Sequence, residues 1–194
     1  MKMFVRYLLL TASAVCICIM ASAQDFAVKT NALYWVSTTP NIGFEVGLGK
    51  KTTLDISAGY NPWTLDRSGE DNMKFKHVKV DPEFRYWFCE RFHGHFIGVN
   101  ALYSYYNVSK IAIPFVNGSR GNRYQGWCAG AGITYGYSWV IGRRWNIEAN
   151  IGVGYLYTAY DRYQNRTCGL FCNAANKHLF GLTDLGVSFI YMIR

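Results

Sequence analysis

Beyond its first 24 residues the chain lacks any uninterrupted run of 18 or more apolar residues, so it offers no membrane-spanning helix there. It also lacks low-complexity stretches and any internal repeat longer than a hairpin. No Gly-x-Ser-x-Gly elbow, His-Glu-x-x-His pair or phosphate-cradling loop is present. These absences argue against a helical membrane protein and against the enzymes that such motifs define.

Acidic residues are scarce as well, because 12 Asp and Glu stand against 20 Lys and Arg, a formal charge of +8. The bases are scattered through predicted turns and not clustered on one element. We therefore expect no nucleic-acid partner, and acidic glycolipid headgroups suit this charge better.

The first residues have the pattern of a secretory signal peptide. Lys2 and Arg6 precede a mostly apolar run over residues 7–20, and Ala21-Ser22-Ala23 is a small-x-small cleavage site. We predict a signal peptide over residues 1–23 and one mature domain over residues 24–194. A lipid anchor on Cys16 or Cys18 is the alternative, although Val15 and Ile17 are poor neighbours for it.

Residues 77–88 alternate between an apolar and a charged face, which predicts a β-strand. Seven further segments alternate in the same way, over residues 28–36, 42–48, 54–60, 97–105, 127–139, 145–157 and 185–193. Opposite the apolar residues stand glycines, small polar residues and charges, which cannot form the core of a soluble barrel. The apolar faces must then meet lipid.

Aromatic residues stand near the ends of these apolar faces, as in the girdles of outer-membrane barrels. They are Tyr34, Tyr60, Tyr86, Tyr105, Tyr137, Trp139, Trp145, Tyr157 and Tyr191. The pattern predicts an all-β fold, an eight-stranded antiparallel up-and-down transmembrane β-barrel with a polar, plugged interior. A soluble ligand-binding barrel is a weaker alternative.

The predicted connections alternate in length. Those over residues 49–52, 89–94 and 141–144 are short, whereas those over about residues 63–76, 107–123 and 161–178 are long. The connections that follow the first, third, fifth and seventh segments are the long ones, except the first of them, at residues 37–41, which is short. This alternation is typical of a barrel with periplasmic turns and longer external loops.

A barrel of eight strands is wide enough only for its own side chains, so we expect no general pore. Charges that point inward must pair in such a low-dielectric interior. We predict a structural ion-pair network, with a proton or ion path as the alternative. Its residues are Lys29, Glu45, Asp55, Lys79, Asp81, Glu83, Arg85, Glu148 and Asp184.

The last strand carries a pattern similar to the signal that barrel-assembly machinery recognises. The residues are Asp184, Gly186, Phe189 and Tyr191, three residues short of the C-terminus. The alternative is that they only reflect the alternation of the strand.

Several short motifs together resemble the domain-of-unknown-function family 3575 of small outer-membrane β-barrel proteins of Gram-negative bacteria. They begin at Lys29, Thr39, Gly59, Glu83, Tyr124, Arg144 and Ile190: KTNALY, TPN, GYNPW, EFRYW, YQGW, RWNIE and IYMI. The resemblance implies one outer-membrane barrel, with some relatives encoded near fimbrial or surface-assembly components. It implies no catalytic residues.

Four cysteines follow the signal peptide. Cys168 and Cys172 are expected to form a local disulfide in an oxidising compartment. A metal site that adds His178 is the alternative, but the local sequence lacks a fourth ligand, and we predict no metal and no cofactor. Cys89 and Cys128 are expected to be free thiols.

Histidines border the long connections at His77 and His178, near Asp66 and Asp161. An enzyme acting on envelope lipid is therefore the alternative function. We favour a structural or surface-interaction role in the outer membrane. The expected partners are outer-membrane lipid and lipopolysaccharide, barrel-assembly machinery during insertion, and a surface protein or glycan that meets the basic long loops.

Overall fold

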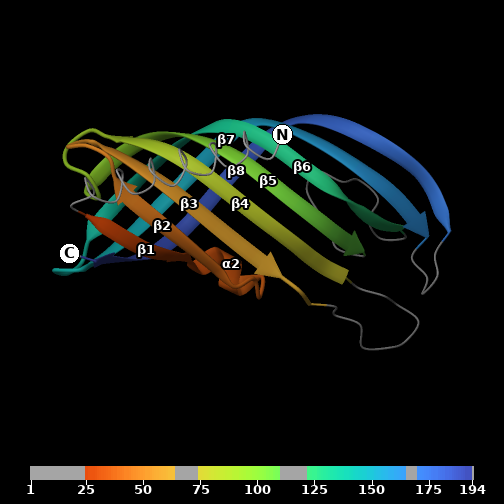
Figure 1. Ribbon diagram of the computed structural model, residues 1–194, viewed down its shortest axis with the longest axis horizontal. Coiled ribbons are helices and arrows are strands. Elements are labelled where there is room, and N and C mark those ends of the chain that lie inside the picture. Colours follow the sequence, from red (N-terminus) through yellow and green to blue (C-terminus); the bar gives the residue numbers. More distant parts are fainter. Residues whose placement is uncertain (1–24, 64–73, 110–121, 165–169, 194) are drawn as a thin grey trace, which may run out of the picture.

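The computed structural model describes residues 25–63, 74–109, 122–164 and 170–193. They form eight strands and one short helix. In chain order these are β1 (Phe26–Asn31), α2 (Ala32–Val36), β2 (Asn41–Gly47), β3 (Thr52–Asn61), β4 (Lys74–Trp87), β5 (Gly94–Ser109), β6 (Asn122–Val140), β7 (Trp145–Gln164) and β8 (Phe171–Ile193). Each strand pairs antiparallel with the next, and β1 pairs with β8, so one sheet closes into a barrel (Figure 1). The predicted eight-stranded antiparallel barrel is confirmed.

The two ends of the barrel differ. Residues 48–51, 88–93 and 141–144 connect strands at one end, which we call the short-turn end. Phe26 pairs with Ile193 there, so the first and last strands meet beside these turns. The opposite end, the long-link end, carries the other four connections. Strands β6 to β8 reach well beyond β2 and β3 at this end (Figure 1).

The barrel wall is apolar outside and polar inside. Phe84, Ile133 and Val153 are 48%, 58% and 54% exposed, whereas Glu83 and Glu148 keep 3% and 1% of their surface. Successive residues of a strand point to opposite faces, so the apolar residues of one parity lie on the outside of each strand. This is the reverse of a soluble barrel, whose apolar set fills the centre.

The strand predicted over residues 28–36 is wrong in its second half, because residues 32–36 form the helix α2 and do not continue β1. The strand ends where the Asn41 side chain binds the backbone N–H and C=O of Asn31, at 2.6 and 3.0 Å, in place of a neighbouring strand. The Asn31 side chain in turn caps the helix by accepting from the N–H of Leu33 at 3.0 Å.

This helix changes two expectations. The first connection at the long-link end runs from Ala32 to Pro40, so it is longer than predicted. The Tyr34 side chain contacts Lys79 in the barrel interior, so Tyr34 is not an outward girdle residue.

The connection predicted over residues 161–178 is also wrong, because β7 continues to Gln164 and β8 begins at Phe171. Residues 173–177 lack the alternation of a half-buried strand, yet they pair with β7 through backbone hydrogen bonds, which require no particular side chain. The register shifts between Gly152 and Val153, where Thr183 is the extra residue of a β-bulge.

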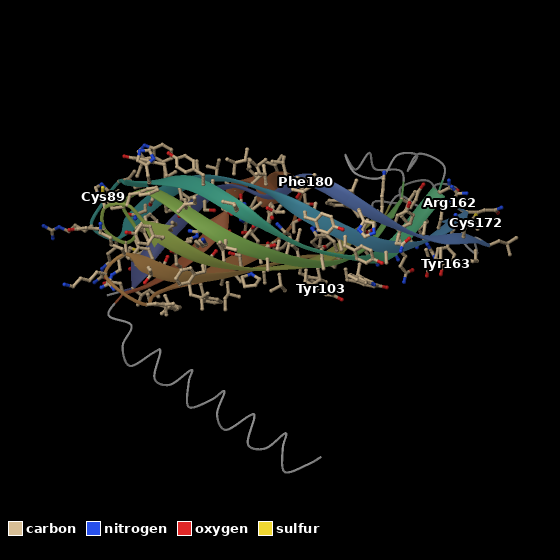
Figure 2. All side chains as sticks on the ribbon, turned by 90° about the horizontal axis from the view of Figure 1, so that it is seen from above. Cys89, Tyr103, Arg162, Tyr163, Cys172 and Phe180 are labelled. Atoms are coloured by element: carbon tan, nitrogen blue, oxygen red, sulfur yellow. The ribbon has the colours of Figure 1, made fainter. Side chains whose placement is uncertain are left out.

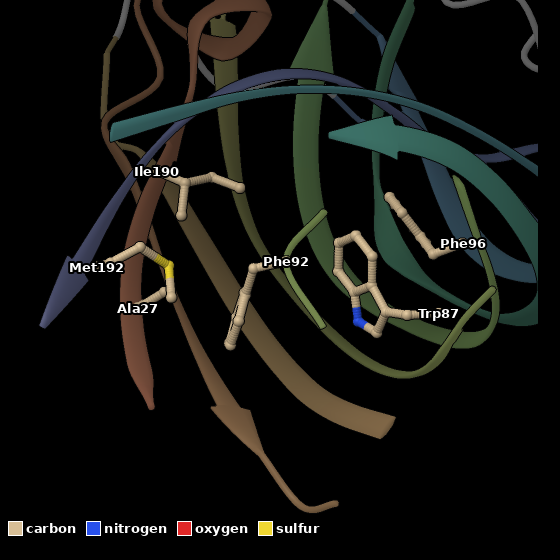
Figure 3. Close-up of a cluster of buried hydrophobic side chains, with 6 residues drawn as sticks. All are labelled: Ala27, Trp87, Phe92, Phe96, Ile190 and Met192. Atoms are coloured by element: carbon tan, nitrogen blue, oxygen red, sulfur yellow. The ribbon is translucent and has the colours of Figure 1, made fainter. Parts of the chain in front are cut away.

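An aromatic plug fills the short-turn end of the interior (Figure 3). It consists of Ala27, Trp87, Phe92, Phe96, Ile190 and Met192, all buried. Phe92 comes from the turn between β4 and β5, and its carbonyl accepts from the Asn146 amide at 2.7 Å and the Ser138 hydroxyl at 3.2 Å. These bonds hold the turn inside the barrel.

Candidate functional site

The centre of the barrel holds a network of buried charges around Arg85. Its Nη1 donates to Glu45 at 3.1 Å and to Glu148 at 3.0 Å, and its Nη2 donates to Glu83 at 2.9 Å. Lys29 lies beside them, 2.7 Å from Asp55 and 3.5 Å from Glu45. The structure thus brings six of the nine predicted network residues into one cluster.

The strand register explains why the two bases are needed. Glu45 lies opposite Asp55, and Asp55 lies opposite Glu83, so three acids line adjacent strands. Like charges directly opposite each other repel, and this repulsion is strong in an interior of low dielectric. Lys29 and Arg85 supply the opposing charge.

Inward glycines leave room for these long side chains. A methyl group at Gly43 would stand 2.8 Å from Cγ of Lys29, and one at Gly98 would stand 3.0 Å from Cδ of Glu83. Contacts of real Cβ atoms are longer than this. Both positions therefore need glycine, the residue that has no Cβ. The sequence pattern of glycine opposite apolar residues therefore encodes space for the network.

The remaining three predicted residues lie toward the long-link end. Lys79 binds Asp81 at 3.0 Å and donates to the phenol oxygen of Tyr34. Asp184 accepts a hydrogen bond from the Asn150 amide. Burial raises the pKa of the Tyr34 phenol above its ordinary value, so the phenol stays neutral and α2 places a polar cap on Lys79.

A cavity of about 30 Å³ lies between these two clusters. Its charged lining comprises Lys29, Arg85, Asp55, Asp81, Glu83, Glu148 and Asp184, five acids and two bases. It is large enough for about two water molecules. The arrangement can hold charges and order water, but a cavity of this size gives no passage to a solute.

Sequence reasoning missed the layer that joins the charges to the aromatic plug. The indole of Trp87 donates to the Thr53 hydroxyl at 2.9 Å, and that hydroxyl donates to Glu45 at 2.6 Å. Arg85 also lies 4.4 Å from the ring centre of Phe96, a cation–π contact. Phe96 has the inward parity of its strand and could have been found, whereas Phe92 lies in a turn without periodicity.

The predicted assembly-signal residues lie on β8. Gly186 is buried, Phe189 is exposed, and the phenol of Tyr191 accepts from Arg144 at 3.3 Å. Nothing in this geometry tests recognition by other proteins, so the signal stays a prediction.

The described cysteines are Cys89, Cys128 and Cys172, and no disulfide joins any two of them. Cys89 is exposed in a turn, Cys128 is half-buried on β6, and Cys172 is exposed at the start of β8. Cys168 lies outside the described residues, as does the predicted signal peptide over residues 1–23. The disulfide between Cys168 and Cys172 therefore stays a prediction.

The histidines of the enzyme hypothesis lie on opposite faces of the barrel wall. His77 shares the inward parity of Lys79 and packs on Phe75, whereas exposed His178 contacts the phenol of Tyr155 outside. Asp161 is described on β7, and Asp66 lies outside the described residues. His77 and His178 therefore do not share one site.

Residues 25–63, 74–109, 122–164 and 170–193 contain no group of three or more His, Cys, Asp or Glu arranged to hold a metal ion. No helix within these ranges is long and apolar enough to cross a bilayer.

The fold and interior define a class: a closed eight-stranded β-barrel with an apolar outer wall and a charged, plugged centre. The chain belongs to the family described as "Protein of unknown function (DUF3575)", whose profile matches residues 8–193. The family resemblance seen in the sequence motifs is thereby confirmed. No curated protein and no solved structure matches the chain.

Proposed function

We propose that this protein is a small outer-membrane β-barrel with a structural or surface-interaction role in the cell envelope. The observation that carries the proposal is the apolar outer wall. Its exposed residues include Ile56, Phe84, Val99, Ile133 and Val153, on five of the eight strands. Monomeric soluble proteins rarely expose apolar surface on this scale, whereas a bilayer requires it.

The height of the apolar wall supports the proposal. Trp127 and Trp139 stand twelve residues apart on β6, and Trp145 and Tyr157 are equally far apart on β7. At about 3.3 Å per residue and a tilt of about 40°, this is roughly 30 Å along the barrel axis. An outer-membrane barrel has an apolar band about 25 Å tall between its aromatic girdles.

The closed interior supports a role in structure or interaction over transport. The aromatic plug fills one end, and Arg85 and Lys29 bind carboxylates across the middle. The long-link end would then face the cell exterior, with the short turns in the periplasm and residues 1–23 acting as the export signal. Lipopolysaccharide and surface proteins or glycans are the proposed partners, and barrel-assembly machinery the partner during insertion.

Epitope tags placed at the two ends test both location and orientation. We expect the full chain to fractionate with outer membranes and to resist extraction by urea. A tag inserted at Thr38, at the long-link end, should bind antibody on intact cells, whereas a tag at Gly142 should bind only after the envelope is opened. Recovery of the folded protein as a detergent-free periplasmic species would refute the proposal.

A further inference from the structure

An open groove lies on the outer wall where the apolar band ends at the long-link end. Its volume is about 450 Å³, within the range of small-ligand sites. The residues that define it are Tyr105, Gln125, Trp127, Tyr157, Asp161 and Asn176, from β5, β6, β7 and β8. Figure 2 shows Tyr103, which stacks on Trp127, on the outer surface of this side of the barrel.

The strand register forms this groove from two adjacent rows. Tyr105, Trp127, Ala159 and Asn176 lie opposite one another across the four strands. The next outward-facing row toward the long-link end is Asn107, Gln125, Asp161 and Ala174. Outward side chains on β5 and β6 therefore change from aromatic to amide within one step, and β7 places the Asp161 carboxylate beside Gln125.

The floor of the groove consists of aromatic rings that contact one another. The ring centres of Trp127 and Tyr157 are 5.4 Å apart, and those of Trp127 and Tyr103 are 6.3 Å apart and nearly parallel. Trp127 keeps 37% of its surface exposed and Tyr105 keeps 45%. The rings thus form an apolar platform with exposed surface.

Hydrogen bonds fix the polar edge above that platform. The Gln125 amide donates to the Tyr105 phenol at 2.7 Å, and the Asn176 amide donates to the Tyr157 phenol at 3.3 Å. Asp161 lies opposite Gln125 in the register. A ligand here meets oriented amides and a carboxylate on one side and ring faces on the other.

We propose that this groove binds the saccharide headgroup of a glycolipid of the outer leaflet, an inference that rests on the proposed outer-membrane location. Sugar rings present apolar C–H faces that suit aromatic platforms, and hydroxyls that pair with amides and carboxylates. An acyl chain in the same place would offer no hydrogen-bonding group to the oriented amides or to the Asp161 carboxylate, so this polar edge suits a sugar better.

Continuity with the outer wall favours a glycolipid over a free sugar. The outward parity of β6 and β7 continues from the groove into Ile133 and Val153, both more than half exposed. A ligand whose sugars lie in the groove would place its acyl chains along this band. The groove is thus the surface on which the lipopolysaccharide of the proposed function would bind.

The test uses the mature chain in phospholipid nanodiscs and a soluble core oligosaccharide, released by mild acid from lipopolysaccharide and free of lipid. Saturation-transfer NMR measures its binding. Trp127→Ala should weaken binding at least about tenfold, because a large ring surface is lost. Trp139→Ala is the matched control, since Trp139 lies outward on the same strand at the opposite girdle, and it should bind as the wild type does.

Gln125→Ala removes one amide without changing the ring platform and should weaken binding about threefold or more. It keeps the test valid if Trp127→Ala does not insert. Equal binding by the wild type, Trp127→Ala and Gln125→Ala would overturn the proposal, as would no binding by inserted wild type.

Two further outcomes also overturn the saccharide proposal but have different meanings. Binding of intact lipopolysaccharide without binding of the oligosaccharide would assign recognition to the acyl chains. Failure of the wild type to insert into nanodiscs would refute the membrane location itself. Insertion is measured by the heat-dependent gel mobility of a folded barrel, which does not depend on any sugar.

Discussion

The core of the barrel and its extension at the long-link end are built by different rules. In the core, all eight strands enclose Arg85, Lys29 and their carboxylates, and both faces of each strand are constrained. In the extension, residues 106–109, 122–126, 158–164 and 171–177 of β5 to β8 project beyond β1 to β3, and residues 74–77 of β4 pair along their edge. A smaller interior cluster there contains Val108 and Tyr124.

The difference separates what holds the fold from what the fold displays. The core fixes its strands by burying charge pairs and rings inside and apolar residues toward the proposed bilayer. The extension depends on backbone pairing, and its outward surface carries the amides, the carboxylate and the phenols of the groove. Substitutions should therefore be most costly in the core.

The largest effect is expected from Arg85→Ala. It leaves Glu45, Glu83 and Glu148 buried without their main cation, a loss of about 3–5 kcal/mol of folding free energy. Urea titration of the protein in lipid vesicles measures it. Arg143→Ala, in an exposed turn, is the control and should change the free energy of unfolding by less than about 0.5 kcal/mol. Equal stability of both variants would show that the charge network does not hold the core.

A charge introduced on the outer wall should cost less folding free energy than the loss of Arg85. That cost should depend on the position of the charge along the barrel axis. Val153→Arg places a cation within the apolar band of β7 and should cost about 2–4 kcal/mol, whereas Ala159→Arg, on the same face beside the groove, should cost about 0–1 kcal/mol. The same titration compares them. Equal costs at the two positions would remove the evidence for a membrane boundary between them.

Filling the space of an inward glycine should have a moderate effect. Gly98→Ala forces the new methyl group against the Glu83 carboxylate and should cost about 1–3 kcal/mol. Gly142→Ala is the matched control, because a methyl group there meets only Cβ of Trp145 at 3.9 Å. A neutral Gly98→Ala would mean that Glu83 can move without loss.

The smallest effect is expected at the boundary between core and extension, in the cap of α2. Asn31→Ala removes the acceptor for the Leu33 N–H and should cost about 1 kcal/mol. Because Tyr34 lies on α2, the variant should also loosen the contact between Tyr34 and Lys79. Faster hydrogen exchange at residues 32–39, and at Val187, whose N–H also donates to the Asn31 side chain at 3.4 Å, would support this. Unchanged exchange would contradict it.

The sequence predicted the fold correctly where both faces of a strand are constrained, one to be apolar and the other to be polar or charged. Residues 77–88 alternate because one face is apolar and the other carries Lys79, Asp81, Glu83 and Arg85, so strand, parity and network could be read together. It failed at residues 32–36, where alternation is present but Asn31 and Asn41 use their side chains to end the strand. Side-chain capping of this kind has no periodicity.

It failed again at residues 171–177, for the opposite reason. Backbone pairing with β7 forms a strand whose side chains face no core, so no alternation marks it. The groove was missed for a related reason, since Trp127, Tyr157 and Gln125 become neighbours only through the register of β6 with β7. A single sequence shows which face a residue takes, but not which residues on other strands lie beside it.

The most direct test of the inside-out barrel is quenching of tryptophan fluorescence by brominated phospholipids. The chain has six tryptophans, so variants that keep only Trp139 or only Trp87, with the other five changed to Phe, report on the outer wall and the interior. In vesicles of brominated lipid, Trp139 should be strongly quenched and buried Trp87 should keep most of its emission. Equal quenching of the two, or quenching of Trp87 alone, would contradict the account.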